Sequence, residues 1–86
     1  MAVVEEFGTD FAKIVECESG FNVRATHKNY NNSIDGGFAQ INSSHLKRAK
    51  ELGYDLSTIQ GQFDYVRLLI KNRKYDDWTC KYVLEE

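Results

Sequence analysis

The segment CESGFNVRATHKNYNNSIDGGFAQINS, residues 17–43, carries more structural information than any other part of the chain. Near its start lie a carboxylate, Glu18, and a glycine, Gly20, and a polar run rich in Asn, Ser, Gly and Asp follows. Such residues favour turns and interrupt helices. Residues 21–42 are therefore predicted to form turns that join short strands in a small, solvated hairpin.

Upstream of this segment, residues 2–19 are predicted to form a helix. The apolar positions that recur there at helical spacing are Val4, Phe7, Phe11, Ile14 and Val15. The alternative is a shorter helix that begins after Gly8 and is capped by Thr9 or Asp10. Gly20 occupies the position expected of a C-terminal helix cap.

Two more helices are predicted downstream. The first covers residues 44–52 and is capped by Ser43 or Ser44, and the second covers residues 57–73 and is capped at its first residue. Their apolar stripes are Leu46, Ala49 and Leu52, and Ile59, Phe63, Val66, Leu69 and Ile70. Residues 75–83 are expected to fold back onto the first helix as a short helix or turn.

Length and composition restrict the class of protein. A chain of 86 residues with 42% hydrophobic residues is predicted to form one α+β domain, mostly α, over residues 1–86. A net charge of −2 argues against a nucleic-acid binder, which needs a basic surface. No apolar run reaches the roughly 20 residues that cross a membrane. The N-terminal residues lack the basic and apolar regions of a signal peptide.

Two carboxylates with different surroundings are the candidate catalytic groups. Glu18 continues the apolar stripe of the first predicted helix, where burial should raise its pKa toward the range of a general acid. Asp35 lies in the polar insert, where it should stay ionised. Glycosidases use such a pair of unlike carboxyl groups. The alternatives are a glutamate that reaches solvent at a frayed helix end and an aspartate in a glycine turn.

The same region resembles the core of c-type lysozyme, and order and spacing match without a gap over residues 18–43. The matching residues are Glu18-Ser19-Gly20-Phe21-Asn22, Ala25-Thr26, Asn29, Ser33, Asp35, Gly37 and Gln40-Ile41-Asn42-Ser43. More loosely, the region resembles goose-type lysozymes and soluble lytic transglycosylases. Cys17 directly before Glu18, with Cys80 near the C-terminus, resembles the resuscitation-promoting factors. The resemblance implies a lysozyme-like fold with a small β-hairpin insert after the first helix.

The resemblance also implies a peptidoglycan muramidase, which hydrolyses the β-1,4 bond between N-acetylmuramic acid and N-acetylglucosamine. Glu18 falls on the catalytic acid and Asp35 on the second carboxylate of the c-type enzymes. Two alternatives stay open: a lytic transglycosylase that forms 1,6-anhydromuramic ends without needing Asp35, and a non-catalytic lysozyme-like module that binds glycan or a partner. The presence of both carboxylates favours hydrolysis.

Four neutral polar residues fall on substrate-binding positions of the family. Gln40 and Asn42 fall on cleft residues that hold the sugar N-acetyl group and the hairpin backbone. Asn29 and Ser33 fall near the second carboxylate, where such residues orient it or meet the sugar. Amide and hydroxyl groups suit this work because they bond to sugars without the desolvation cost of a charge.

The chain departs from the family pattern at two positions. Gly36 stands where an aromatic residue usually precedes the glycine, and His45 stands where the c-type enzymes place a tryptophan that stacks on sugar. His27 and His45 are expected at the surface. The aromatic residues that could supply stacking instead, although helical spacing favours a core role for them, are Tyr30, Tyr54, Trp78 and Tyr82.

Cys17 and Cys80 are candidates for a disulfide, which would close nearly the whole chain and stabilise it by on the order of 4 kcal/mol. Two buried free thiols are the alternative. Two cysteines do not complete a zinc site, and the histidines lie at no metal-binding spacing from them, so no metal or cofactor is expected.

The expected partner is the peptidoglycan glycan strand, bound by a monomer. The expected location is the cell wall, reached by secretion or another delivery route, in periplasm, extracellular space or a phage particle.

Overall fold

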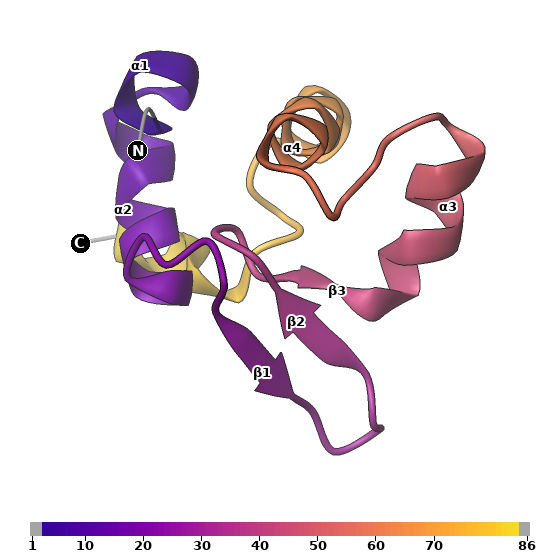
Figure 1. Ribbon diagram of the computed structural model, residues 1–86. Helices are drawn as coiled ribbons and strands as arrows, with labels where there is room; N and C mark the ends of the chain where they lie inside the picture. The colour runs from indigo at the N-terminus through magenta and orange to yellow at the C-terminus, as the bar shows by residue number, and fades with distance from the viewer. Residues whose placement is uncertain (1–2, 85–86) are drawn as a thin grey trace.

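The computed structural model describes residues 3–84, which form a small α+β body with a Cα radius of gyration of 12.1 Å. A compact chain of this length is expected to have a radius of about 12 Å. The elements, in chain order, are α1 (Val3–Phe7), α2 (Thr9–Ser19), β1 (Thr26–Lys28), β2 (Ile34–Gly36), β3 (Ile41–Asn42), the 3-10 turn η1 (Ser43–His45), α3 (Leu46–Glu51), α4 (Ile59–Arg73) and the 3-10 segment η2 (Thr79–Leu84). Figure 1 shows the β1–β2 hairpin extending away from α2 and α4, while β3 leads toward α3.

The first predicted helix is divided in two. Gly8 has φ +88°, outside the helical region, so α1 ends at Phe7 and α2 starts at Thr9. A single helix over residues 2–19 is therefore wrong, and the shorter alternative after Gly8 is confirmed. Gly8 itself occupies the cap position, in place of either predicted capping side chain. Ala2, where the longer helix was to begin, lies outside the described residues.

The end of α2 is formed as predicted. Gly20 adopts a left-handed conformation, with φ +60°, and its N–H donates to the Glu16 carbonyl. This conformation favours glycine because a side chain at positive φ is strained. The cap ends the helix two residues after Glu18, so the Glu18 side chain belongs to the last turn.

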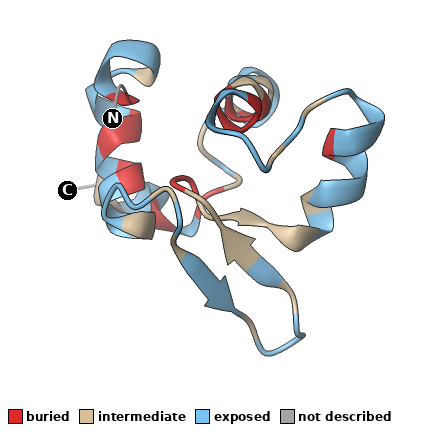
Figure 2. Cartoon of the chain, viewed as in Figure 1, coloured by how far each residue is buried: buried red, intermediate tan, exposed pale blue. Residues whose placement is uncertain are grey.

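The polar insert forms a three-stranded antiparallel sheet in the order β1-β2-β3, one strand more than the predicted hairpin. Thr26 pairs with Gly36 and His27 with Asp35 on one side, and Asp35 pairs with Asn42 on the other. The third strand arises because the chain reverses at Gly37, which has φ +81°. β1 is exposed along its whole length, as predicted for a solvated sheet (Figure 2).

The two downstream helices form, but their caps differ from those predicted. Asn42 caps η1 by accepting from the Ser44 N–H at 3.0 Å, and α3 follows. Thr58, not Ser57, caps α4 by accepting from the Gly61 N–H at 2.9 Å. Ser57 instead donates to the Asp55 carboxylate, which closes the preceding turn.

The apolar stripe predicted for α3 is largely exposed, because only Ala49 is buried while Leu46 and Leu52 face solvent. By contrast, α4 buries the middle of its stripe and also the full side chain of Tyr65.

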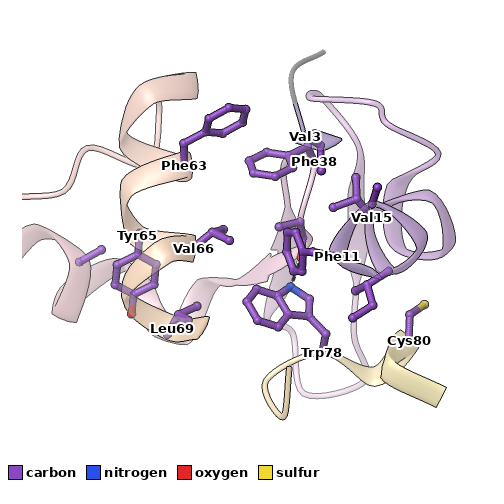
Figure 3. Packing of buried hydrophobic residues seen from close by; sticks show 14 residues of the cluster. Val3, Phe11, Val15, Phe38, Phe63, Tyr65, Val66, Leu69, Trp78 and Cys80 are labelled. Carbon is purple, nitrogen blue, oxygen red and sulfur yellow. Dashed lines mark hydrogen bonds between the residues drawn. The ribbon is translucent and has the colours of Figure 1, made fainter. Parts of the chain in front are cut away.

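The core lies between α2 and α4, and Figure 3 shows Phe11, Phe38 and Trp78 gathered there. The Trp78 ring meets Phe11 edge to face at a centroid distance of 4.8 Å. Its indole N–H donates to the Ala39 carbonyl at 2.8 Å. These contacts join the loop after α4 to the turn between β2 and β3, so the core fixes the sheet relative to both helices.

The C-terminal segment η2 packs against α2, and a disulfide joins Cys17 to Cys80. The predicted pairing and the predicted return of residues 75–83 to the first helix are therefore confirmed. No helix among the described residues is long and apolar enough to cross a membrane.

Candidate active site

A groove of about 560 Å³ opens where the end of α2, the sheet, η1 and the loop after α4 meet. Pockets that hold small molecules commonly have a volume of this order. The groove brings together all six residues predicted for catalysis or substrate binding: Glu18, Asn29, Ser33, Asp35, Gln40 and Asn42. They come from one helix, two strands and two turns, so only the folded chain places them side by side.

Glu18 is half-buried at the last turn of α2. Burial raises the pKa of its carboxyl, and the negative charge of Asp35 raises the pKa further. The backbone N–H of Cys80 donates to Oε1 at 3.3 Å and acts in the opposite direction, because it favours the ionised form. Burial is the largest of the three effects, so the pKa of Glu18 lies above its ordinary value.

The contact with Cys80 also distinguishes the two oxygens of Glu18. Because Oε1 accepts a hydrogen bond from the backbone, the proton of the neutral acid is better placed on the other oxygen. A carboxyl group that holds its proton beside a groove can donate it to a bound molecule.

Asp35 lies on β2 between two neighbouring strands, and its Oδ1 accepts from the Asn42 side-chain amide at 2.8 Å. Asn42 pairs with Asp35 across the sheet, and residues opposite each other in antiparallel strands share a face. The same amide group donates to Ser33 Oγ at 2.9 Å. Asp35 is thereby held as an acceptor beside Glu18.

Asn29 and Ser33 build the turn between β1 and β2. The Asn29 amide donates to Ser33 Oγ at 3.2 Å, and Ser33 Oγ donates to Asn31 Oδ1 at 2.6 Å. The four side chains Asn29, Ser33, Asn42 and Asp35 therefore form one connected series of hydrogen bonds along the groove wall. Such a series holds its members in fixed positions.

Gln40 closes the turn between β2 and β3. Its amide nitrogen donates to the Ala25 carbonyl at 3.0 Å and to the Gly37 carbonyl at 2.9 Å. These bonds tie the turn to the entry of β1. Gln40 thus holds the hairpin backbone, one of the two tasks that the resemblance implies for this position.

The groove also contains residues that the sequence did not indicate. Asp77 lies in the loop after α4, where its Oδ1 accepts from Arg73 at 3.0 Å and its Oδ2 is buried without a hydrogen-bond partner among the described residues. Thr79 lines the groove two residues later. No local pattern marks these positions, because they reach the groove only through the packing of Trp78.

The two histidines differ. His27 is exposed, as predicted, but it pairs with Asp35 across the sheet and so shares its face. His45 is half-buried and lines the groove, at the position where the resemblance places a tryptophan that stacks on sugar. The pairing of His27 with Asp35 could have been found from the sequence, had the strand register been known.

Among the four aromatic candidates for stacking, only Tyr30 is both exposed and on the groove. Trp78 touches the groove but is buried in the core, and Tyr54 packs against Tyr65. Tyr82 lies beside Cys17, with its hydroxyl 3.6 Å from the sulfur. Tyr30, at the turn between β1 and β2, is therefore the available stacking surface.

Residues 3–84 contain no group of three or more His, Cys, Asp or Glu residues placed to hold a metal ion. The groove presents amide, hydroxyl and carboxyl groups, which can transfer protons or form hydrogen bonds.

Comparison with known proteins gives a partial match. No known family model matches the chain, and no solved structure matches it. The chain is 54% identical over 41 residues to protein IpgF of Shigella flexneri, a stretch that covers 48% of this chain and 27% of IpgF. Protein IpgF of Shigella sonnei matches with the same identity and coverage. The match therefore spans about a quarter of the length of these curated relatives and makes this chain similar to part of IpgF.

Proposed function

We propose that this protein is a muramidase with a lysozyme-like fold, which hydrolyses the β-1,4 bond between N-acetylmuramic acid and N-acetylglucosamine in peptidoglycan. The observation that carries the proposal is the pair of unlike carboxyl groups. Glu18 has a raised pKa in a half-buried position, and Asp35 is bound by Asn42 beside it. Pairs of this kind perform acid-assisted glycoside cleavage.

In this mechanism Glu18 donates its proton to the glycosidic oxygen, and the bond to the sugar carbon breaks. Positive charge then develops on the sugar, and Asp35 stabilises or captures it. Water attacks the same carbon, and Glu18 accepts the proton that the water loses. The amide of Asn42 keeps Asp35 directed toward the groove throughout.

Replacing the acid tests the proposal directly. Glu18→Gln keeps the size of the side chain and an oxygen for the Cys80 N–H but removes the transferable proton. Lysis of purified peptidoglycan, followed by turbidity, should fall about 100- to 10,000-fold. Glu16→Gln is the matched control, because Glu16 is exposed on the same helix and does not line the groove. A folded Glu18→Gln protein with full activity would exclude this function.

Product analysis separates hydrolysis from transglycosylation. Hydrolysis leaves reducing ends, whereas a lytic transglycosylase leaves 1,6-anhydromuramic ends. The bond from Asn42 to Asp35 favours hydrolysis, because an oriented second carboxylate is needed only on that route. Asp35→Asn should therefore reduce activity strongly. Retained activity with anhydro products would assign the transglycosylase reaction, and glycan binding without any cleavage would assign a non-catalytic binding module.

The proposed substrate also defines partner and location. Peptidoglycan lies outside the cytoplasmic membrane, so the protein would act after secretion or another form of delivery, in the periplasm, the extracellular space or a phage particle. The disulfide between Cys17 and Cys80 suits such compartments, where thiols become oxidised. The groove is formed by one chain, so a monomer would suffice.

A further inference from the structure

A carboxylate in the groove wall has one oxygen without a hydrogen-bond partner. Asp77 lines the groove, and its Oδ2 is buried but accepts from no donor among residues 3–84. The other oxygen, Oδ1, accepts from the Arg73 guanidinium at 3.0 Å. A buried acceptor that lacks a donor costs free energy, so its presence in a native fold calls for a reason.

The ion pair with Arg73 does not supply that reason. The Arg73 side chain is 62% exposed, whereas the Asp77 side chain is only 12% exposed. A pair whose cation lies largely in solvent contributes little to stability. A neutral side chain at position 77 would therefore serve the fold at least as well as this half-satisfied carboxylate.

The backbone nevertheless holds Asp77 in a fixed place. The N–H of the next residue, Trp78, donates to the Tyr75 carbonyl at 3.1 Å. The Trp78 ring is buried against Phe11 in the core (Figure 3). The turn and the core thus fix the acceptor at the groove before any ligand arrives, which lowers the cost of binding.

The charges of the groove indicate which ligand groups suit this acceptor. Glu18, Asp35 and Asp77 all line the groove, so a negatively charged group beside Asp77 would be repelled. A hydroxyl group or an amide N–H can donate to a carboxylate oxygen without that repulsion. Sugar rings carry several hydroxyl groups, and N-acetyl groups add amide donors.

We propose that the Asp77 carboxylate binds the substrate by accepting a hydrogen bond from a hydroxyl or amide N–H of a neutral sugar unit. The terminal torsion of an aspartate is soft, so the carboxylate can turn to meet the sugar while the exposed Arg73 follows it. This inference rests on the proposed function, because it adds a contact to the same glycan.

Calorimetry with an oligomer of N-acetylglucosamine tests the contact, because this glycan is uncharged and carries no peptide. Binding is measured on the Glu18→Gln protein, so that no turnover occurs. Asp77→Asn in this background keeps the shape of the side chain but replaces one acceptor with a donor. The affinity should fall about tenfold or more, the effect of one hydrogen bond to a charged group.

Asp76→Asn is the matched control. The Asp76 side chain is 58% exposed, accepts from Lys81 at 3.2 Å and does not line the groove. The substitution removes the same charge one residue away and should leave the affinity within about twofold, because solvent and salt screen an exposed charge. An equal loss in both variants would mean that the net charge of the loop determines binding, and the role of Asp77 would be refuted.

The melting temperature separates a binding role from a structural one. Asp77→Asn should not lower it, because the substitution removes a buried charge and only a weak ion pair. A melting temperature that falls together with the affinity would mean that Asp77 acts through the fold, and the direct contact would be refuted. In NMR spectra, the carboxyl carbon resonance of Asp77 should also shift when the oligomer binds.

The remaining outcomes distinguish this inference from the proposed function. Unchanged affinity in Asp77→Asn, the result expected if the unpaired oxygen merely holds a buried water, would overturn the inference and leave the muramidase proposal standing. Absence of oligomer binding, with peptidoglycan lysis by the parent protein intact, would do the same. Absence of both binding and lysis would overturn both.

Discussion

Asn42 links the end of the sheet to the candidate acid-base pair. Its side-chain oxygen accepts from the Ser44 N–H and so caps η1, while its amide nitrogen donates to Asp35 and Ser33. One side chain thus both begins the next element and orients a carboxylate. The cap and the donor function can be separated, because aspartate caps as well as asparagine but cannot donate.

Asn42→Asp should leave the fold intact and impair activity. It keeps the cap on Ser44 but replaces the bond to Asp35 with a second negative charge. Two adjacent carboxylates favour the binding of a proton, which removes the charge that would stabilise the sugar cation. We expect kcat/KM to fall about tenfold or more, with a steeper loss toward acid pH. Asn32→Asp makes the same charge change in the β1–β2 turn outside the groove, and it should retain activity.

Glu18 should also affect stability in a pH-dependent way. Its pKa is higher in the folded than in the unfolded protein, so ionisation of the folded protein is opposed by burial. This cost is absent below about pH 4.5, where the carboxyl is protonated in both states, and it is complete above the raised pKa. Glu18→Gln removes the cost. The variant should melt a few degrees above the parent at about pH 8, and the difference should vanish near about pH 4.

Thermal unfolding across this pH range checks the expectation. Glu16→Gln should show no such trend, because Glu16 is exposed on the same helix. A stabilisation that grows toward acid pH would mean that the folded protein favours the ionised form of Glu18, and this would remove the basis for its role as an acid.

At the scale of elements, the periodic helices could be predicted from the sequence, whereas the exact breaks and strand pairings could not. The apolar repeat of α4 indicated a helix over residues 57–73, and the helix covers Ile59–Arg73. The Asn- and Gly-rich insert indicated strands, but the third strand depends on the reversal at Gly37, which brings β3 beside β2. The sequence alone gives the break at Gly8 only as one of two alternatives, because glycine inside a helical pattern is often tolerated.

The same division applies to the groove. The motif in residues 17–43 indicated six residues that do line it. Asp77 was not predicted as a groove residue, and the resemblance gave a cleft position for His45 but not its contacts, because the surroundings of both residues come from distant segments. Asp77 is placed by the packing of Trp78 on Phe11, and His45 by the hydroxyl of a tyrosine twenty positions away. A local pattern contains no information about such contacts.

Gly61 shows how closely α4 approaches the preceding turn. Its φ is ordinary for a helix, and alanine normally stabilises such a position. Here, however, a Cβ would collide with the Asp55 backbone carbonyl. Gly61→Ala should therefore lower the free energy of unfolding by about 2 kcal/mol, as overpacking does. Urea unfolding measures the change, and a stabilised variant would show that the turn yields without cost.

Gly53→Ala, in the loop between α3 and α4, provides a contrast with Gly61→Ala. A Cβ there meets no atom within 4 Å, but φ is +89°. The cost should come from backbone strain alone, at about 1 kcal/mol. The two variants together separate crowding from conformational strain.

At the scale of the whole molecule, one covalent bond joins the end of α2 to η2. The disulfide from Cys17 to Cys80 spans 63 positions and fixes η2 against α2. The same contact carries the Cys80 N–H to Glu18. Small domains bury a smaller fraction of their surface than large ones, and a free energy of unfolding of about 5–15 kcal/mol is usual. The disulfide therefore stabilises the folded chain and also holds the Cys80 N–H against Glu18 in the groove.

Removing the disulfide with Cys17→Ser and Cys80→Ala should lower the free energy of unfolding by about 4 kcal/mol, because the unfolded chain gains the entropy of a long open loop. Activity on peptidoglycan should fall as well, although neither substitution adds or removes a charge in the groove. The reason is that a looser η2 holds the Cys80 N–H less firmly against Glu18 and lets water reach its carboxyl. Urea unfolding and turbidity assays measure the two effects.

A reducing agent provides the control. It should lower the stability and activity of the parent protein to those of the double variant, and it should leave the double variant unchanged. If stability falls as expected but the activity of the folded fraction does not, then the placement of Glu18 depends on the packing of Trp78 and not on the covalent bond.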